Sequence, residues 1–159
     1  MNNTTWGNAR HQYYETVCGG SGAGRLADGS GHDGTGGVHT HMTNSRLTDP
    51  EVLEWRFPVV LDEFSIRQRS GGKGEFCGGD GTRRKTRFLE PMTLAILTGH
   101  RVEPPPGLDN GGSGEVGRSR VVRADGAVEE LRSADRTELG AGDVYWLDTP
   151  TGGGFTPKG

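Results

Sequence analysis

The chain has 159 residues, of which 29 are glycine and only 30% are hydrophobic, so few side chains are available for a core. Its formal net charge of -3 argues against phosphate-dominated binding of nucleic acid, and its longest apolar runs fall far short of the ~20 residues needed to cross a bilayer. We therefore expect one domain with no nucleic-acid or membrane partner, which is either rich in loops or completed by another chain.

The beginning of the chain and its cysteines bear on its cellular setting. The opening MNNTTWGNARHQ has no apolar segment and no cleavage-site pattern, so no secretory signal is visible. Only two cysteines are present, Cys18 and Cys77, which is too few for a disulfide-stabilised scaffold. A reducing, cytoplasmic setting is therefore expected.

Residues 1–46 are predicted to form a long structured loop. They combine polar, aromatic and glycine residues with almost no helical or strand periodicity. Loops of this length are usually functional or disordered, but Trp6, Tyr13 and Tyr14 provide aromatic anchors that a disordered linker would lack. We expect this region to be ordered.

A short helix is predicted over residues 48–57. Thr48 begins the sequence T-D-P-E, in which a threonine at the N-cap and Glu51 at the third helical position form a capping box. Pro58 disfavours helical geometry in the residue before it, so the helix is expected to end by Phe57.

Strands are predicted on both sides of a glycine-rich interruption. Residues 59–67 alternate apolar and polar residues toward their end, and six glycines then fall within residues 70–81. Residues 82–89 and 92–97 are typical of two further extended runs, and we expect a hairpin or a bulged turn to join them near Pro91.

The last third of the chain is predicted to consist of loops and short strands. Residues 103–117 are rich in proline and glycine, so no regular element is expected there. Asp125-Gly126 indicates a type I′ hairpin turn between two strands, and residues 144–147 form a last short strand. The predicted fold class is α+β and β-dominated: short strands and hairpins with long glycine-rich loops and one short helix.

The glycine run at residues 19–24 has two interpretations. Successive glycine amides can form an anion-binding nest, but Arg25 stands where a dinucleotide-binding fingerprint requires its third glycine. Lys73, likewise, is followed by a glycine and not by the serine or threonine of a P-loop. The alternative is that glycine permits backbone conformations closed to other residues.

His39 and His41 form the sharpest cluster of chemically competent side chains. In an extended segment, an H-x-H pair places both imidazoles on one face. Imidazoles and carboxylates are ligands for zinc, manganese or iron. The alternative is that both histidines hydrogen-bond backbone carbonyls of the glycine loops. Further candidate ligands a short loop away are Asp28, His32 and Asp33.

Two other features have both a chemical and a structural interpretation. Cys18 is a possible nucleophile, with a nearby histidine as its base. Residues 83–87, RRKTR, are a possible phosphate contact, although basic residues on an edge strand more often prevent edge-to-edge pairing.

Five segments are distinctive enough to carry a resemblance: NNTTWGN, HQYYETVCGGSGAG, GVHTHMTNSRLTDPEVLEWRFPVVLDEFSIR, PPPGL and TPTGGGF. In this order they resemble the C-terminal part of the hydantoinase B/oxoprolinase family, and its ATP-dependent 5-oxoprolinases most of all. The resemblance implies a share in opening a cyclic amide with ATP, either 5-oxo-L-proline to L-glutamate or a hydantoin. Carboxylases for acetone and acetophenone are relatives, so the resemblance does not identify one substrate.

The resemblance also implies how the work is divided. ATP and Mg are expected on a separate hydantoinase A-type ATPase partner, with no cofactor and no metal bound by this chain. Catalytic roles are implied for His39, His41 and Asn44. The glycine run is implied to contribute pocket backbone for a small cyclic-amide substrate, through Gly19, Gly20, Ser21, Gly22 and Gly24.

Residues 1–159 are, by the same resemblance, the C-terminal portion of a hydantoinase B/oxoprolinase domain. Family chains are several-fold longer, so an N-terminal B-type segment is expected as a further partner. Within the chain, residues 1–46 form the motif-bearing loop region and residues 47–159 the strand-rich region. The chain alone is expected to be inactive. The alternative is a non-catalytic interaction module that binds the hydantoinase A-type partner.

Overall fold

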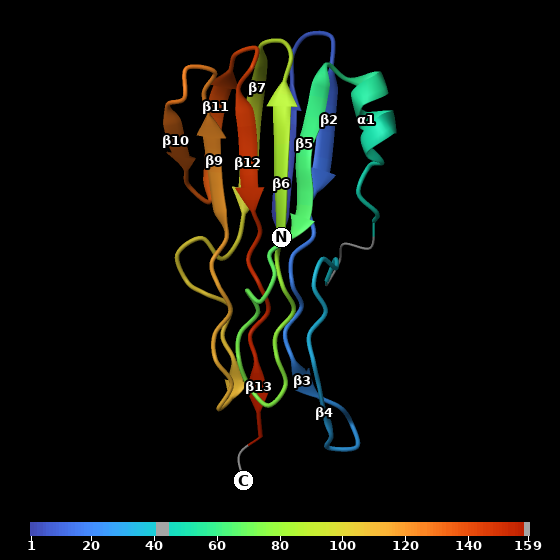
Figure 1. The fold of residues 1–159 in the computed structure, drawn as a ribbon, viewed down its shortest axis with the longest axis vertical. Helices are drawn as coiled ribbons and strands as arrows, with labels where there is room; N and C mark the ends of the chain where they lie inside the picture. The colour runs from blue at the N-terminus through green and yellow to red at the C-terminus, as the bar shows by residue number, and fades with distance from the viewer. Residues whose placement is uncertain (41–44, 158–159) are drawn as a thin grey trace.

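The computed structural model describes residues 1–40 and 45–157. The upper part in Figure 1 is a sandwich of two antiparallel sheets, and the lower part is a set of extended segments that run side by side. Sheet 1 has the strand order β11 (Ala134–Leu139), β7 (Met92–Thr98), β1 (Asn2–Gly7) and β2 (Gln12–Thr16). Sheet 2 has the order β10 (Val128–Leu131), β9 (Arg118–Val122), β12 (Val144–Asp148), β6 (Thr82–Phe88) and β5 (Val59–Ile66).

The remaining elements are small. Helix α1 (Pro50–Arg56) lies at the edge of the sandwich, beside β2 and β5 (Figure 1). The two-residue strands β3 (Gly24–Arg25), β4 (Gly31–His32), β8 (Leu108–Asp109) and β13 (Phe155–Thr156) lie at the far end of the lower part. This architecture confirms the predicted β-dominated class with one short helix. Nowhere in residues 1–40 and 45–157 is there a helix with the length and apolar character to cross a membrane.

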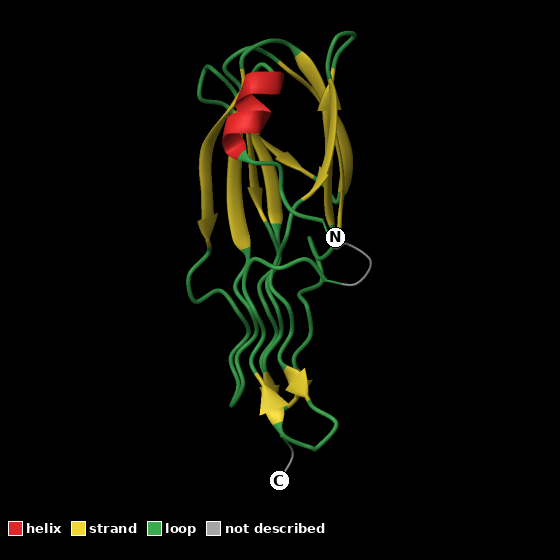
Figure 2. Ribbon diagram, turned by 90° about the vertical axis from the view of Figure 1, so that its right-hand side faces the viewer, coloured by secondary structure: helices red, strands yellow, loops and turns green. Residues whose placement is uncertain are grey.

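The hydrophobic core lies between the two sheets (Figure 2) and is centred on Trp6. The Trp6 ring stacks on Tyr13 with ring centroids 4.6 Å apart, and it meets Phe57 and Phe88 edge to face. Offset-stacked and edge-to-face pairs are the arrangements that aromatic quadrupoles favour. The other buried members of the core are Val17, Leu53, Val59, Met92, Leu94, Ile96, Val121, Leu131, Leu139, Tyr145 and Leu147.

The prediction of a loop over residues 1–46 is wrong for the first 16 residues, where β1 and β2 form. β1 is an interior strand, paired with β2 on one side and β7 on the other. Its inward positions include Asn2 and Thr4 as well as Trp6, so apolar and polar residues do not alternate. Asn2 is tolerated inside because its side-chain amide donates to the Val17 carbonyl (3.1 Å) and accepts from Arg101 (3.1 Å).

Helix α1 is present within the predicted range, but its cap differs from the prediction. The N-cap residue is Asp49, whose carboxylate accepts from the backbone N–H groups of Glu51 (2.9 Å) and Val52 (3.4 Å). The Thr48 hydroxyl instead accepts a hydrogen bond from the Tyr13 hydroxyl (2.9 Å), so no capping box forms. Phe57 is extended, as expected before a proline.

The strands predicted around residues 59–97 are confirmed as β5, β6 and β7, but the hairpin between the last two is wrong. β6 belongs to sheet 2 and β7 to sheet 1, so the residues near Pro91 cross from one sheet to the other. Strand β11 was not predicted, because Leu139 is its only buried residue. The short strand β8 also forms within the segment 103–117, where no regular element was expected.

A hairpin does turn at Asp125-Gly126, between β9 and β10, but the turn is not of type I′. Gly126 has a φ of 88°, whereas Asp125 is not among the residues with positive φ. Gly126 N–H donates to the Arg123 carbonyl (2.9 Å), and Arg123 N–H donates to the Ala127 carbonyl (2.7 Å). This pattern is a longer turn closed by a glycine bulge.

The lower part of the molecule is held together by its backbone, and we call it the glycine bundle. Its segments hydrogen-bond to one another: Gly79 N–H donates to Ser21, Gly152 N–H to Gly79, and Gly72 N–H to Gly152, each at 2.8 Å. The segments approach so closely that a Cβ on Gly152 would lie 1.8 Å from the Ser21 carbonyl oxygen. Glycine is therefore required here by close packing of backbones. The bundle comprises residues 19–24, 34–37, 71–81, 105–114 and 150–155.

Candidate functional site

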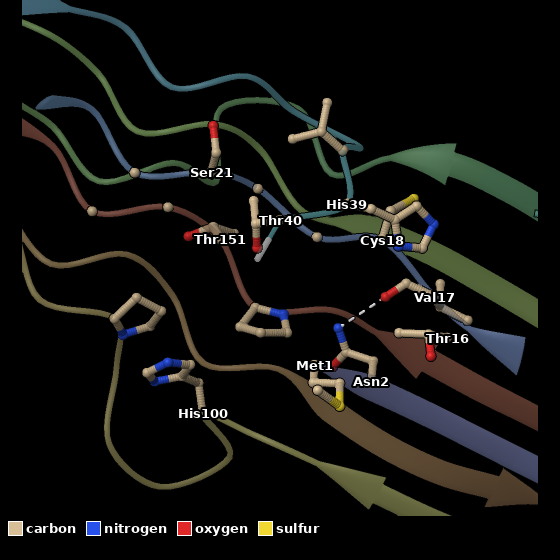
Figure 3. Close-up of a pocket in the computed structure, with 18 of the residues that line it drawn as sticks. Met1, Asn2, Thr16, Val17, Cys18, Ser21, His39, Thr40, His100 and Thr151 are labelled. Carbon is tan, nitrogen blue, oxygen red and sulfur yellow. Dashed lines mark hydrogen bonds between the residues drawn. The ribbon is translucent and has the colours of Figure 1, made fainter. Parts of the chain in front are cut away.

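A cavity of about 330 Å³ lies where the sandwich meets the glycine bundle (Figure 3). Five parts of the chain line it, and they come together at this level. The lining residues are Met1, Asn2, Thr16, Val17, Cys18, Gly19, Gly20, Ser21, Gly22, Val38, His39, Thr40, His100, Pro105, Pro106, Pro150, Thr151, Gly152 and Gly153. The cavity therefore combines small backbone surfaces with two histidines and one thiol.

Cys18 and His39 are brought together by a single bridge between two segments of the glycine bundle. Gly19 and Val38 form an antiparallel bridge, with Val38 N–H donating to the Gly19 carbonyl at 2.9 Å. In an antiparallel pair, the residues that flank the bridge also lie opposite each other. Cys18 therefore faces His39, and Figure 3 shows both at the same end of the cavity.

The His39 imidazole has an unused hydrogen-bonding atom. Its Nε2 is buried and has no hydrogen-bond partner among the residues that the structure describes. A buried polar atom without a partner costs about 1–3 kcal/mol, so such atoms usually mark a place for a water or a ligand. His39 is therefore the residue of this cavity best placed to bind a polar group. The other two predicted catalytic residues, His41 and Asn44, lie outside the described residues.

Cys18 does not have the surroundings of an activated nucleophile. Its side chain is buried, and burial raises the pKa of the Cys18 thiol above its ordinary value. No hydrogen bond joins its sulfur to Nε2 of His39. The structure places the two residues opposite each other without forming the thiolate–imidazole pair that the nucleophile hypothesis requires.

This difference in burial predicts selective thiol reactivity. Cys77 is exposed and Cys18 is buried, so we expect an aromatic disulfide reagent to modify Cys77 at least roughly 100-fold faster in the native protein, since Cys18 must wait for local opening. The measurement is the absorbance of the released thiolate, with Cys77→Ser and Cys18→Ser as matched single-thiol variants. Equal rates for the two variants would show that Cys18 is accessible.

The glycine run lines the cavity only in part, and its amides do not form an anion nest. Gly19, Gly20, Ser21 and Gly22 line the cavity, whereas Gly24 belongs to β3. The amides are already used within the bundle: Gly20 donates to Pro150 (3.3 Å), Ser21 to Thr35 (3.0 Å) and Ala23 to Gly153 (2.9 Å). The run therefore supplies backbone surface, and the anion-nest interpretation is not supported.

His100 is a cavity residue that the sequence did not single out. Figure 3 shows it across the cavity from Cys18 and His39. It has a φ of 51°, which is uncommon for a residue with a Cβ, and its Nδ1 lies 3.1 Å from the Glu103 carbonyl oxygen. Residues in such strained conformations concentrate at functional sites. An isolated histidine after a glycine carries no motif that would have revealed this.

Asp28, His32 and Asp33 do not join His39. Asp28 accepts from the hydroxyl of Ser30 at 2.6 Å, and this bond holds the pKa of Asp28 below its ordinary value. Asp33 accepts from the Cys77 N–H (2.7 Å), and the Asp33 carbonyl oxygen lies 2.9 Å from Nδ1 of His32. None of the three lines the cavity. Within the described ranges, no three His, Cys, Asp or Glu residues gather as metal ligands would.

The basic segment at residues 83–87 lies on β6, an interior strand of sheet 2, so its interpretation as a guard of a sheet edge is wrong. The neighbouring strands place a carboxylate beside each of its three outward charges. Arg83 pairs with Asp148 (2.7 Å), Lys85 with Glu63 (2.7 Å), and Arg87 with Asp62.

Residues 1–158 match the family model described as Hydantoinase B/oxoprolinase. The chain is 42% identical over 155 residues to 5-oxoprolinase 1 of Arabidopsis thaliana, with 98% of this chain and 12% of the relative covered. It is 40% identical over 158 residues to 5-oxoprolinase of Dictyostelium discoideum, with 99% and 12% covered. The chain thus spans only about an eighth of the length of these relatives.

Two solved structures have the same fold. ATP-dependent caprolactamase from Pseudomonas jessenii matches with a TM-score of 0.67 at 22% identity, over 97% of this chain and 28% of that one. The nucleotide-free structure of acetone carboxylase matches with a TM-score of 0.66 at 16% identity, over 98% of this chain and 25% of that one. At these identities, the likeness concerns the fold alone.

Proposed function

The chain belongs to the hydantoinase B/oxoprolinase family, and on that premise we propose that it forms part of the substrate site of an ATP-dependent enzyme that opens a cyclic amide. The observation that carries the proposal is the cavity with Nε2 of His39, which has no hydrogen-bond partner in residues 1–40 and 45–157. Its volume of about 330 Å³ is at the small end of the range of ligand pockets, which suits a small ring.

The proposed substrate is 5-oxo-L-proline, with L-glutamate as the product, and a hydantoin is the alternative ring. Both the Arabidopsis and the Dictyostelium relatives bear the name 5-oxoprolinase, and a more distant relative from a Pseudomonas strain is named for a D-/L-hydantoinase. Both rings present an amide N–H and a carbonyl oxygen. A neutral imidazole donates to the carbonyl or accepts from the N–H, according to its tautomer.

We assign the nucleotide chemistry to a hydantoinase A-type partner. ATP and Mg would bind there, because the sequence of this chain has neither a P-loop nor a dinucleotide fingerprint. The partner would activate the ring carbonyl by phosphorylation, and this chain would hold the ring. Both cysteines are free, and we extend the proposal to a cytoplasmic setting.

The test is 5-oxoproline-dependent ATP hydrolysis by the chain combined with a hydantoinase A-type partner and the rest of a B-type polypeptide. His39→Ala is expected to lower kcat/KM roughly tenfold or more, since one hydrogen bond to the substrate is worth about 1 kcal/mol and a proton-transfer role is worth more. His32→Ala is the matched control, because His32 is an exposed histidine outside the cavity. Equal activity of His39→Ala and His32→Ala would show that His39 does not act in the substrate site. Inactivity of the reconstituted wild type would contradict the proposed function.

His41 and Asn44 remain proposed catalytic residues. A loss of activity in His41→Ala is expected only in the reconstituted enzyme, because the isolated chain is proposed to have no turnover of its own.

A further inference from the structure

The register of sheet 1 places uncharged side chains over three of its four strands. Trp6 and Leu94 point into the core, so the residues alternating with them point outward. The pairing of β1 with β2 and β7 aligns these outward residues in three rows across the sheet. We call this surface the neutral face: Asn3, Thr5 and Gly7 of β1, Gln12, Tyr14 and Thr16 of β2, and Thr93, Ala95 and Leu97 of β7.

The outer face of sheet 2 has the opposite character. Its outward residues carry many charges, and most of these are paired with one another. Trp146, the large aromatic residue of that face, is covered by Lys85 and Arg120, whose charged groups both lie 4.0 Å from its ring centroid. The charged outward residues are Glu63, Arg83, Lys85, Arg87, Arg118, Arg120, Glu130 and Asp148. We therefore expect the outer face of sheet 2 to be in contact with water.

The neutral face has the composition of the centre of an interface. Tyr14 and Leu97 are 62% and 61% exposed, and none of the outward-facing residues around them on β1, β2 and β7 is charged. Charged side chains begin only at the rim, where β11 contributes Arg136 and Glu138. An uncharged centre that exposes tyrosine and leucine, surrounded by a charged rim, matches the depletion of charge and enrichment of tyrosine at the centre of protein–protein contacts.

The size of the neutral face bears on what covers it. Three strands about 4.8 Å apart and about six residues long span on the order of 300 Å². A second copy of this chain, docked face to face, would bury well below the roughly 1,200–2,000 Å² of a stable free interface. A larger polypeptide that reaches beyond the rim is better suited, and the 5-oxoprolinase relatives have such a polypeptide, because this chain matches only 12% of their length.

We propose that the neutral face docks against the part of a hydantoinase B-type polypeptide that lies outside the region matched by this chain. The docked polypeptide would add a third layer to the two-sheet sandwich, packed on the outer face of sheet 1, while the charged face of sheet 2 stays in water. The assignment depends on the shape and charge of sheet 1 and on the length of the relatives. It does not depend on which ring is hydrolysed.

The experiment compares two lysine substitutions at equally exposed aliphatic residues. Leu97 lies on the neutral face, and Val128 is 57% exposed on the outer face of sheet 2. The probe is a tagged hydantoinase B-type polypeptide that lacks the region matching this chain, titrated with wild type, Leu97→Lys and Val128→Lys. We expect Leu97→Lys to weaken binding at least tenfold and Val128→Lys to bind as wild type. Tyr14→Arg is a second neutral-face variant, and unchanged thermal unfolding of the free chains identifies the variants that remain folded.

Several results would overturn the assignment. The first is that folded Leu97→Lys and Tyr14→Arg bind the probe as tightly as the wild type does. The second is that Val128→Lys weakens binding as much as Leu97→Lys does. The third is that the wild type does not bind the probe. A wild-type dimer that Leu97→Lys dissociates would assign the face to a second copy instead. A loss confined to binding of the hydantoinase A-type partner would assign it to that partner. Because the readout is binding, the result stands apart from whether the reconstituted enzyme turns over 5-oxoproline.

Discussion

Replacing Gly152 by alanine is expected to destabilise the chain by about 3 kcal/mol or more, which is at the upper end of the cost of overpacking because rigid backbone must move. The new Cβ would lie 1.8 Å from the Ser21 carbonyl oxygen and 2.4 Å from its carbonyl carbon. These atoms cannot swing away as the end of a side chain would. Separation of the two segments would also strain the hydrogen bonds that Gly152 and Gly79 make across the bundle. Urea unfolding followed by circular dichroism measures the loss.

Gly22→Ala is the matched control within the same bundle. Among the described residues, the one atom within 4 Å of a Cβ on Gly22 would be the Gly153 carbonyl oxygen, at 3.8 Å, and the φ of Gly22 is not in the left-handed region. Its unfolding free energy is expected to stay within about 1 kcal/mol of wild type, since alanine also restricts the unfolded chain. If Gly152→Ala were as stable as Gly22→Ala, close backbone packing would not be the reason for glycine in the bundle.

Arg84→Met is expected to cost about 3–5 kcal/mol, because it leaves a buried carboxylate without its partner. Nη2 of Arg84 lies 3.1 Å from Oε2 of Glu15, and the two side chains are only 7% and 8% exposed between the sheets. The other oxygen of Glu15 accepts from the Thr48 N–H (2.8 Å), so the carboxylate also fixes the segment that leads into α1. Thermal and urea unfolding of the single variant measure the effect.

Two companion variants make this prediction specific. Arg83→Met breaks an ion pair at the outer face of sheet 2 and is expected to cost clearly less than Arg84→Met, since Asp148 keeps Arg120 as a partner at 2.9 Å. The double variant Arg84→Met with Glu15→Leu removes both buried charges and is expected to recover much of the loss. An Arg84→Met variant as stable as Arg83→Met would mean that the Glu15 carboxylate is not confined in the core.

The sequence predicts the elements whose signals are local. Pro58 ends α1, and residues 59–97 give three strands close to their predicted positions. Local signals fail where inward polar groups are satisfied by distant partners, as with Asn2 in β1, whose partner Arg101 is far along the chain. They also fail for β6 and β7, because a short connection does not reveal whether the chain returns to the same sheet or crosses to the other.

The candidate site is predictable only in part for a related reason. The family motif singles out His39 and the glycine run, and His39 and residues 19–22 of the run line the cavity. That Cys18 faces His39 depends on one bridge between segments about 20 residues apart, formed only when the glycine bundle assembles. His100 reaches the same cavity from the other side, through a loop whose left-handed residue carries no sequence signature.

The glycine bundle affects how the stability of the chain changes with temperature. Most of its contacts are between backbones, and the stacked pair of Phe76 and the buried Phe155 is its main aromatic contact, so its melting exposes mainly peptide groups. Apolar exposure raises the heat capacity of unfolding, whereas polar exposure lowers it. The sandwich, with Trp6 and its neighbours, is therefore expected to supply most of the curvature in the stability of this chain with temperature. The bundle is expected to lose less stability on cooling than the sandwich, because the hydrophobic driving force that fades on cooling contributes less to it.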